Sequence, residues 1–368
     1  MAKYKRKKVK RYHRSFYTRA ETIKRAVGVG ALVLAVLVAA WFAAPHVLDW
    51  ATHTWYTVVK NRDLDAESAA AASSSVLPQE PESSSVPEEP VTAEPEEPQA
   101  EPLDGKAVGA GSWAVLERSE LTDASAITAA AQRLAQQGAA YALVSLKEAD
   151  GSIYYQSAVA NASRSIAEQT VDAALIAQTL RDNGIIPVAQ LCAFQDPKSA
   201  YADRSMAIHY SAEMLWLDNV SAEAGGKPWL NPYADSAVQF VGDLVEEVCS
   251  MGYEQVVLTG VQFPKVASAK QDFGETGGKS RAEQLRADIA AWQNRFEDSA
   301  VLWFSYPAQQ AAQSSGELGA PAVKLGMHDL LLTADTAMSE KTRAELEQTA
   351  AAAGVEQLVI RDSRALFD

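Results

Sequence analysis

The stretches QQGAAYALV (136–144), RDNGIIPVA (181–189), CSMGYEQVV (249–257) and AAAGVEQLV (351–359) share one order of features. In each, a helix-like stretch ends, a glycine follows, and an apolar strand-like run begins within a few residues. Glycine suits the left-handed conformation just past a helix end. Strands that follow helices in this way belong to βαβ units with parallel strands. The repeat therefore predicts an α/β domain built on a parallel sheet.

The stretches between these strands have the apolar face that such helices need. Residues 281–296 carry large apolar residues at steps of four, three and four, and residues 234–251 carry a valine and leucine stripe opposite acidic residues. Each pattern predicts a helix that buries one face against the sheet. Asp123 is a predicted N-cap for a helix that runs to Gln137.

Eight strands are predicted in the 262 residues from 107 to 368, which fits a (β/α)8 TIM barrel of about 250 residues. An open doubly wound sheet is the alternative. No G-x-G-x-x-G follows the first strand, so nothing supports nucleotide binding. The predicted strands are Trp113–Leu116, Ala142–Lys147, Ile185–Phe194, Glu213–Leu217, Gln255–Val261, Ala300–Phe304, Asp329–Leu332 and Gln357–Ile360, of which the fourth has the weakest pattern.

The first hundred residues differ sharply from this domain. Residues 1–25 contain eleven Lys or Arg and one acid, whereas residues 26–44 contain no charge. Nineteen apolar residues span about 29 Å as a helix, enough for a bilayer. We therefore predict a transmembrane helix over 26–44. The basic tail predicts a cytoplasmic N-terminus and an extracellular barrel domain on a single-pass membrane protein. A cleaved signal peptide is the competing interpretation.

Residues 45–106 form a predicted juxtamembrane segment and acidic linker rich in Pro, Glu and Ser. Within it, residues 63–105 contain twelve acids and no base. Such a segment has too few large apolar residues to offset the entropy of ordering, so a disordered, extended stalk is expected. The net charge of the chain, −14, argues against nucleic acid as a partner of the folded domain.

The sequence gives no indication of a metal site or a cofactor. The five histidines lack metal-ligand spacing, and the two cysteines, Cys192 and Cys249, are expected to be unpaired thiols in apolar surroundings. The sequence does not indicate an oligomeric state.

Four pieces of the chain resemble the bacterial "putative glycosyl hydrolase domain" family of barrel proteins. They are ALVSLKEADGSIYYQS (142–157), GIIPVAQLCAFQDP (184–197), LWLDNVSAEAGGKPWLNPY (215–233) and MGYEQVVLTGVQFP (251–264). Together they cover about a third of the chain. The resemblance implies a glycoside hydrolase-like barrel.

The sequence departs from the family at the charged positions. The family's second strand resembles V-x-D-x-K, and here Ser145 stands at the place of the Asp, although Lys147 remains. In the third strand, Gln190 stands where the family carries an Arg. In the later strand, Thr259 stands where the family carries an acid, and Gln262 stands where it carries a second Arg. Glycoside hydrolysis needs two carboxyl groups across the scissile bond, which serine and threonine cannot provide.

Three functions remain open from the sequence. The first is a degenerate glycosidase-like barrel that binds a polysaccharide or peptidoglycan without cleaving it. The second is an active glycoside hydrolase with rearranged carboxylates, for which Asp150 and Asp218 are the candidates. The third is an envelope scaffold without a glycan site. Candidate glycan-binding residues, whose aromatic or polar side chains fall near strand ends, are Lys147, Gln190, Trp216, Trp229, Tyr233, Gln262 and Tyr306.

Overall fold

The computed structural model describes residues 111–219, 225–265 and 270–368. The predicted basic tail (1–25), transmembrane helix (26–44) and linker (45–106) lie outside these residues and stay predictions. Among the residues that the structure describes, no helix is long and apolar enough to cross a membrane.

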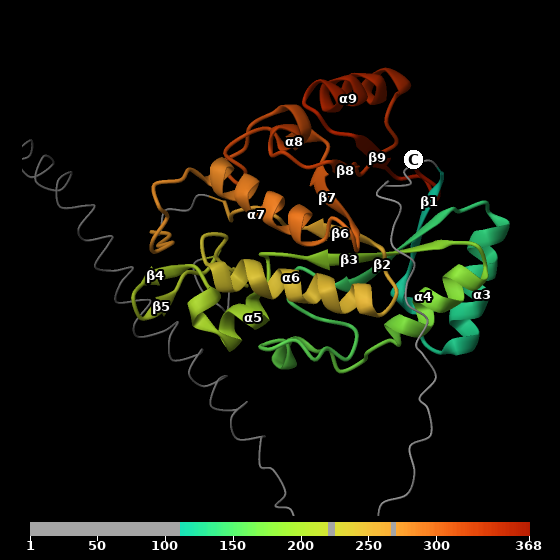
Figure 1. Cartoon of the computed structure of the whole chain (residues 1–368), viewed down its shortest axis with the longest axis horizontal. Coiled ribbons are helices and arrows are strands. Elements are labelled where there is room, and N and C mark those ends of the chain that lie inside the picture. Colours follow the sequence, from blue (N-terminus) through green and yellow to red (C-terminus); the bar gives the residue numbers. More distant parts are fainter. Residues whose placement is uncertain (1–110, 220–224, 266–269) are drawn as a thin grey trace, which may run out of the picture. The chain divides into compact units, whose positions relative to one another are not determined.

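Seven parallel strands form one curled sheet in the order β1-β2-β3-β6-β7-β8-β9 (Figure 1). They are β1 (Trp113–Leu116), β2 (Tyr141–Lys147), β3 (Ile186–Cys192), β6 (Gln255–Thr259), β7 (Val301–Pro307), β8 (Asp329–Thr333) and β9 (Gln357–Arg361). Neighbours in the sheet follow one another along the chain with no reversal of strand order. This order is that of an α/β barrel rather than a doubly wound sheet.

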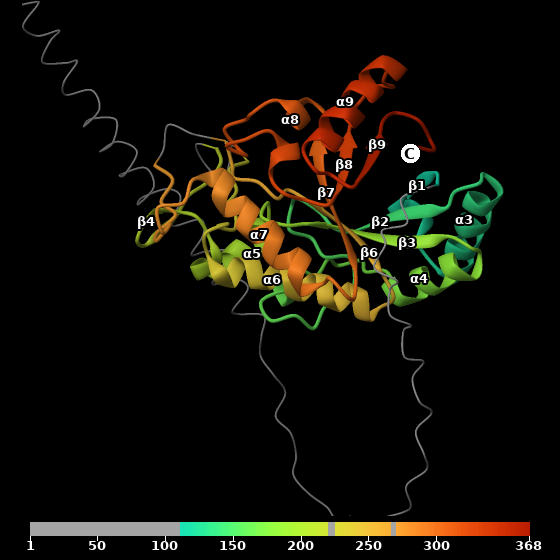
Figure 2. The same cartoon turned by 45° about the horizontal axis from the view of Figure 1, so that its top comes forward.

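Helices connect the strands and cover the outer face of the sheet. Figure 2 shows α3 and α4 beside β1 to β3, and α8 and α9 beside β7 to β9. The helices are α3 (Ala124–Gln136), α4 (Ala173–Asp182), α5 (Pro197–Ala202), α6 (Asp235–Ser250), α7 (Arg281–Arg295), α8 (Gln309–Ala312) and α9 (Glu340–Ala352). Short 3-10 turns are η2 (Arg118–Glu120), η3 (Ser163–Ser165), η4 (Arg204–Met206) and η5 (Ala322–Lys324).

The helix-glycine-strand junctions are confirmed. The four junction glycines all have positive φ, between 73° and 99°, and each precedes a barrel strand by two or three residues. The predicted cap is also confirmed, because Asp123 Oδ1 accepts hydrogen bonds from the backbone N–H groups of Ser125 and Ala126 at 2.9 and 3.0 Å. The apolar faces of α6 and α7 are buried in the main core, as their patterns predicted.

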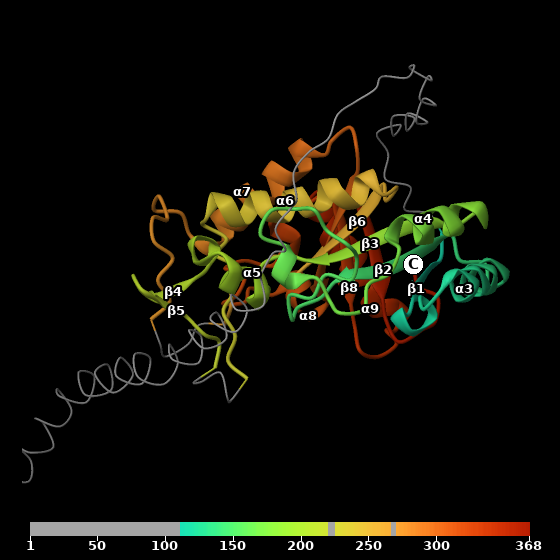
Figure 3. The ribbon, with the colours of Figure 1, turned by 90° about the horizontal axis from the view of Figure 1, so that it is seen from below.

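The prediction that residues 213–217 form a fourth barrel strand is wrong. Met214–Leu215 form β5, which pairs antiparallel with β4 (His209–Ser211) in a separate small sheet. The reason is that β3 pairs directly with β6, which leaves no free edge for another strand. Figure 3 shows β4 and β5 beside α5, away from the curled sheet. Within the residues that the structure describes, the barrel sheet therefore has seven parallel strands instead of the expected eight.

The C-terminal segment, residues 362–368, lies between the two outer strands of the sheet. The backbone N–H of Trp113 in β1 donates to the carbonyl of Phe367 at 2.7 Å, and the N–H of Phe367 donates back at 3.0 Å. On the other side, the N–H of Ile360 in β9 donates to the carbonyl of Asp368 at 2.9 Å. Figure 1 accordingly shows the C-terminus beside β1. This segment occupies the place of an eighth strand.

The inner faces of the strands enclose an interior cluster of apolar side chains. Trp113 stacks on Tyr141 with ring centroids 4.7 Å apart and meets Trp303 edge-on at 5.2 Å. Phe367 from the C-terminal segment completes the cluster and is only 2% exposed. The interior cluster consists of Trp113, Tyr141, Leu143, Val188, Val257, Trp303, Leu331, Val359 and Phe367.

Phe367→Ala should lower the free energy of unfolding by about 3–5 kcal/mol, because it opens a cavity in the interior cluster and weakens the packing of the C-terminal segment. Chemical denaturation monitored by tryptophan fluorescence measures the change. Leu175→Ala, at an apolar side chain that is 37% exposed, is the control and should cost far less. Equal losses in the two variants would contradict the closing role of Phe367.

Asp329, at the start of β8, is 7% exposed, and burial together with the charge of Glu356 raises its pKa to about 7 from a usual 3.8. Between pH 4 and 7 the folded chain thus holds a proton that the unfolded chain has released. The contribution of Asp329 to the free energy of unfolding should fall as the pH rises, by at most about 1.4 kcal/mol per pH unit. Denaturation of wild type and Asp329→Asn across this range should show the difference, and parallel curves would refute it.

Candidate active site at the barrel mouth

The C-terminal ends of the barrel strands meet at one face, called the mouth here. Because side chains alternate along a strand, a residue two positions beyond a member of the interior cluster also points inward. On β1 this position holds the apolar Val115, and on the other six strands it holds a polar residue. These six residues, which we call the polar ring, are Ser145, Gln190, Thr259, Ser305, Thr333 and Arg361. Ser305 is 9% exposed and the other five are partly exposed, whereas the interior cluster beneath them is buried.

Two members of the polar ring are direct neighbours. Ser145 and Gln190 are paired in the register of β2 and β3, and the Gln190 Nε2 lies 3.5 Å from the Ser145 Oγ. These are the places where the resembling family carries an acid and an arginine. The two charged residues would thus have been partners, and loss of both avoids leaving one buried charge unpaired.

Lys147, the last residue of β2, and Asp196 form a fully buried ion pair. The Lys147 Nζ lies 2.9 Å from the Asp196 Oδ2 and donates to the carbonyl of Cys192 at 2.6 Å. Both side chains are 0% exposed. Asp196 Oδ1 also caps α5 by accepting from the N–H of Ser199 at 2.9 Å. The pair holds the end of β2 against the chain that leaves β3, and the Lys147 ammonium has no surface to offer a sugar in this conformation.

The two catalytic candidates both support loop structure and neither belongs to the polar ring. Asp150 is exposed and accepts from the N–H and the hydroxyl of Ser152 at 2.8 and 2.7 Å. Partial burial raises its pKa, but these hydrogen bonds and the charges of Lys198 and Lys227 outweigh burial and lower the pKa below its usual value. Asp150 is therefore ionised at neutral pH and unsuited to the role of proton donor.

Asp218 fastens the loop that carries it. Its carboxylate accepts from the N–H of Lys227 at 2.8 Å and from the Trp229 indole at 3.2 Å. Trp229 is 6% exposed, so this bond orients a largely buried ring. A carboxylate that is occupied in this way acts as a structural acceptor.

The aromatic candidates are mostly buried. Trp216 is 1% and Tyr306 2% exposed, and the Tyr306 hydroxyl donates to the carbonyl of Val261 at 3.0 Å. Tyr233 is half-buried against Phe263 and Phe273. Gln262 is also partly exposed. Among the glycan-binding candidates, Gln190, Tyr233 and Gln262 thus keep the most accessible surface, and their role stays a prediction.

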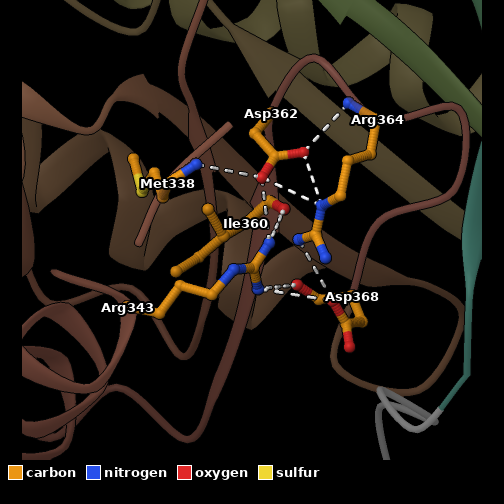
Figure 4. Close-up of polar contacts among 6 residues, drawn as sticks. All are labelled: Met338, Arg343, Ile360, Asp362, Arg364 and Asp368. Carbon is orange, nitrogen blue, oxygen red and sulfur yellow. Dashed lines mark hydrogen bonds and ion pairs between the residues drawn. The ribbon is translucent and has the colours of Figure 1, made fainter. Parts of the chain in front are cut away.

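A buried carboxylate follows β9 (Figure 4). Asp362 accepts from the Arg364 Nε at 2.9 and 3.0 Å and from the Arg343 Nη2 at 3.4 Å. Both arginines also contact Asp368. Two guanidinium groups compensate this carboxylate, so the network fastens the C-terminal segment rather than providing a free acid at the mouth.

Cys192 lies at the same end of the barrel, and burial raises the pKa of its thiol. Within the described ranges both cysteines are free and no cluster of three His, Cys, Asp or Glu side chains could hold a metal ion. Cys249 is only partly buried.

The model of the family described as "putative glycosyl hydrolase domain" matches residues 119–305, about half of the chain. The chain belongs to this family. It therefore has a glycoside hydrolase-like domain, and the matched segment includes β2, β3, β6 and most of β7. Curated proteins give no match.

Solved structures with a similar fold include a hypothetical protein from Ruminiclostridium thermocellum, 19% identical, with a TM-score of 0.45 over 52% of this chain and 96% of that one. A β-N-acetylhexosaminidase from Streptomyces coelicolor is 10% identical, with a TM-score of 0.43. An exo-β-N-acetylglucosaminidase from Vibrio harveyi is 9% identical, with a TM-score of 0.47. The match to these two enzymes covers 68% of this chain but only 48% and 41% of theirs, so this chain spans less than half of each.

Lys147→Met should lower the free energy of unfolding by about 3–5 kcal/mol, because it leaves the Asp196 carboxylate buried and unpaired. Lys341→Met removes an 87% exposed lysine from α9 and serves as the control, with a change below about 0.5 kcal/mol. Urea denaturation compares the two. A Lys147→Met protein as stable as the control would show that the ion pair does not support the mouth.

Proposed function

We propose that this protein is a catalytically degenerate glycosidase-like barrel that binds a cell-envelope or extracellular glycan at its mouth without cleaving it. The supporting observation is the polar ring, which has Ser145, Gln190 and Thr259 where the family carries acids and an arginine. The other acids considered at the mouth have structural partners, as described for Asp150, Asp196, Asp218 and Asp362.

The chemistry of the ring favours binding over hydrolysis. A glycosidase needs two carboxyl groups about 5 to 9.5 Å apart on either side of the scissile bond, and one must hold a proton. Hydroxyl and amide groups cannot fill these roles, but they donate and accept hydrogen bonds and thus match the hydroxyls of a sugar. The half-buried Tyr233 would add an apolar edge for a sugar ring.

The proposed location is the outside of the cell membrane. It rests on the sequence alone, with an uncleaved anchor at residues 26–44, a basic N-terminal tail in the cytoplasm and an acidic stalk that carries the barrel outward. A protein placed in this way would meet polysaccharide or peptidoglycan of the envelope.

The full chain, purified in mild detergent, should bind insoluble peptidoglycan or another envelope polysaccharide in sedimentation assays and release no reducing ends above a protein-free control. Gln190→Ala should weaken binding about tenfold, because it removes a central hydrogen-bonding group of the polar ring. Gln239→Ala, at an exposed glutamine of α6, is the matched control and should bind like wild type.

Two outcomes would contradict this proposal. Release of reducing sugar that disappears in Asp150→Asn or Asp218→Asn would establish an active hydrolase with rearranged carboxylates. Absence of binding to every glycan tested, with retained capture of a protein partner, would favour an envelope scaffold.

A further inference from the structure

The polar ring carries a single charge. Five of its six members are neutral hydroxyl or amide side chains, and the sixth, Arg361, is a guanidinium at the end of β9. Thr333 of β8 is its neighbour in register, and its hydroxyl donates to the carbonyl of Tyr306 at 3.5 Å. A glycan that enters the mouth would therefore meet one cation among neutral hydrogen-bonding groups.

Arg361 points over the barrel interior. Its Cζ lies 6.0 Å from the centroid of the Phe367 ring, and Phe367 belongs to the interior cluster. This contact agrees with the inward direction derived from strand alternation. The side chain is partly buried, so its charge is less well solvated than that of a surface arginine.

Within the described ranges, Arg361 makes no ion pair or hydrogen bond with its side chain. Two other arginines close to the end of β9, Arg343 and Arg364, both pair with Asp362. Because these two guanidinium groups already balance the charge of the Asp362 carboxylate, Asp362 does not form an ion pair with the adjacent Arg361. Glu117, at the end of β1, is exposed and forms no ion pair with Arg361.

An arginine in this setting selects for negative charge. The planar guanidinium binds carboxylate or phosphate oxygens through two parallel hydrogen bonds. In an ordinary glycosidase, the ionised catalytic carboxylate would repel an anionic sugar, but the polar ring contains no carboxylate. Resting on the function proposed above, we propose that the mouth takes a glycan with an anionic substituent, a carboxylate or a phosphate, and that Arg361 determines this specificity.

The test compares polygalacturonate with its carboxyl-reduced form, and a poly(glycerol phosphate) polymer as the phosphate arm. Arg361→Gln in the full chain should weaken binding to one of the two anionic polymers about tenfold and leave binding to the carboxyl-reduced polymer unchanged. The polymer that loses affinity identifies the anionic group. The basic tail at residues 1–25 is common to all variants, so only differences between variants are interpreted.

Lys341→Gln removes one exposed positive charge from α9 and is the control for net charge, with no expected effect. Arg361→Lys keeps the charge and should retain part of the affinity, which separates recognition from misfolding.

Equal binding of wild type and Arg361→Gln to both anionic polymers would overturn the inference. If Gln190→Ala still weakened binding to the carboxyl-reduced polymer, the proposed function would stand. If neither variant changed binding to any polymer, both proposals would fail.

Discussion

The alternation of side chains along parallel strands is the constraint on which the architecture of this domain depends. It divides every strand into residues that fill the barrel and residues that face the helices. It also places the polar ring on the same inward side as the interior cluster, one inward position closer to the mouth. A substitution at such a position, as at Ser145 or Thr259, therefore changes the chemistry of the mouth while leaving the apolar packing beneath it intact.

The C-terminal segment, residues 362–368, affects both the stability of the barrel and the charge at its mouth. Phe367 packs in the interior cluster, and Asp362 forms ion pairs with Arg343 and Arg364 that hold the segment in place. In the same arrangement, the Asp362 carboxylate next to Arg361 forms its ion pairs with Arg343 and Arg364 instead. Closure by a short segment in place of an eighth strand thus leaves a cation at the mouth that no acid neutralises within the described part of the chain.

Local signals were sufficient to predict the barrel strands but not their closure. The junction glycines and the amphipathic stretches identified seven strands and their parallel direction. The 213–217 run looked like a strand because it is apolar, yet its partner was decided by tertiary pairing of β3 with β6. The family pattern identified Ser145 and Gln190 as replaced positions. Arg361 could have been identified as a mouth residue only from the two-residue alternation along β9, starting from the buried Val359. Burial of Trp216 and Tyr306 depends on contacts between distant segments and has no local signal.

We propose that the mouth binds sugar without a pair of catalytic carboxyl groups. A crystal structure of the protein with a bound oligosaccharide tests it most directly. We expect a sugar that contacts hydroxyl, amide and guanidinium groups of the polar ring, with no two carboxyl groups flanking a glycosidic bond. Two carboxyl groups about 5 to 9.5 Å apart on opposite sides of that bond would contradict it.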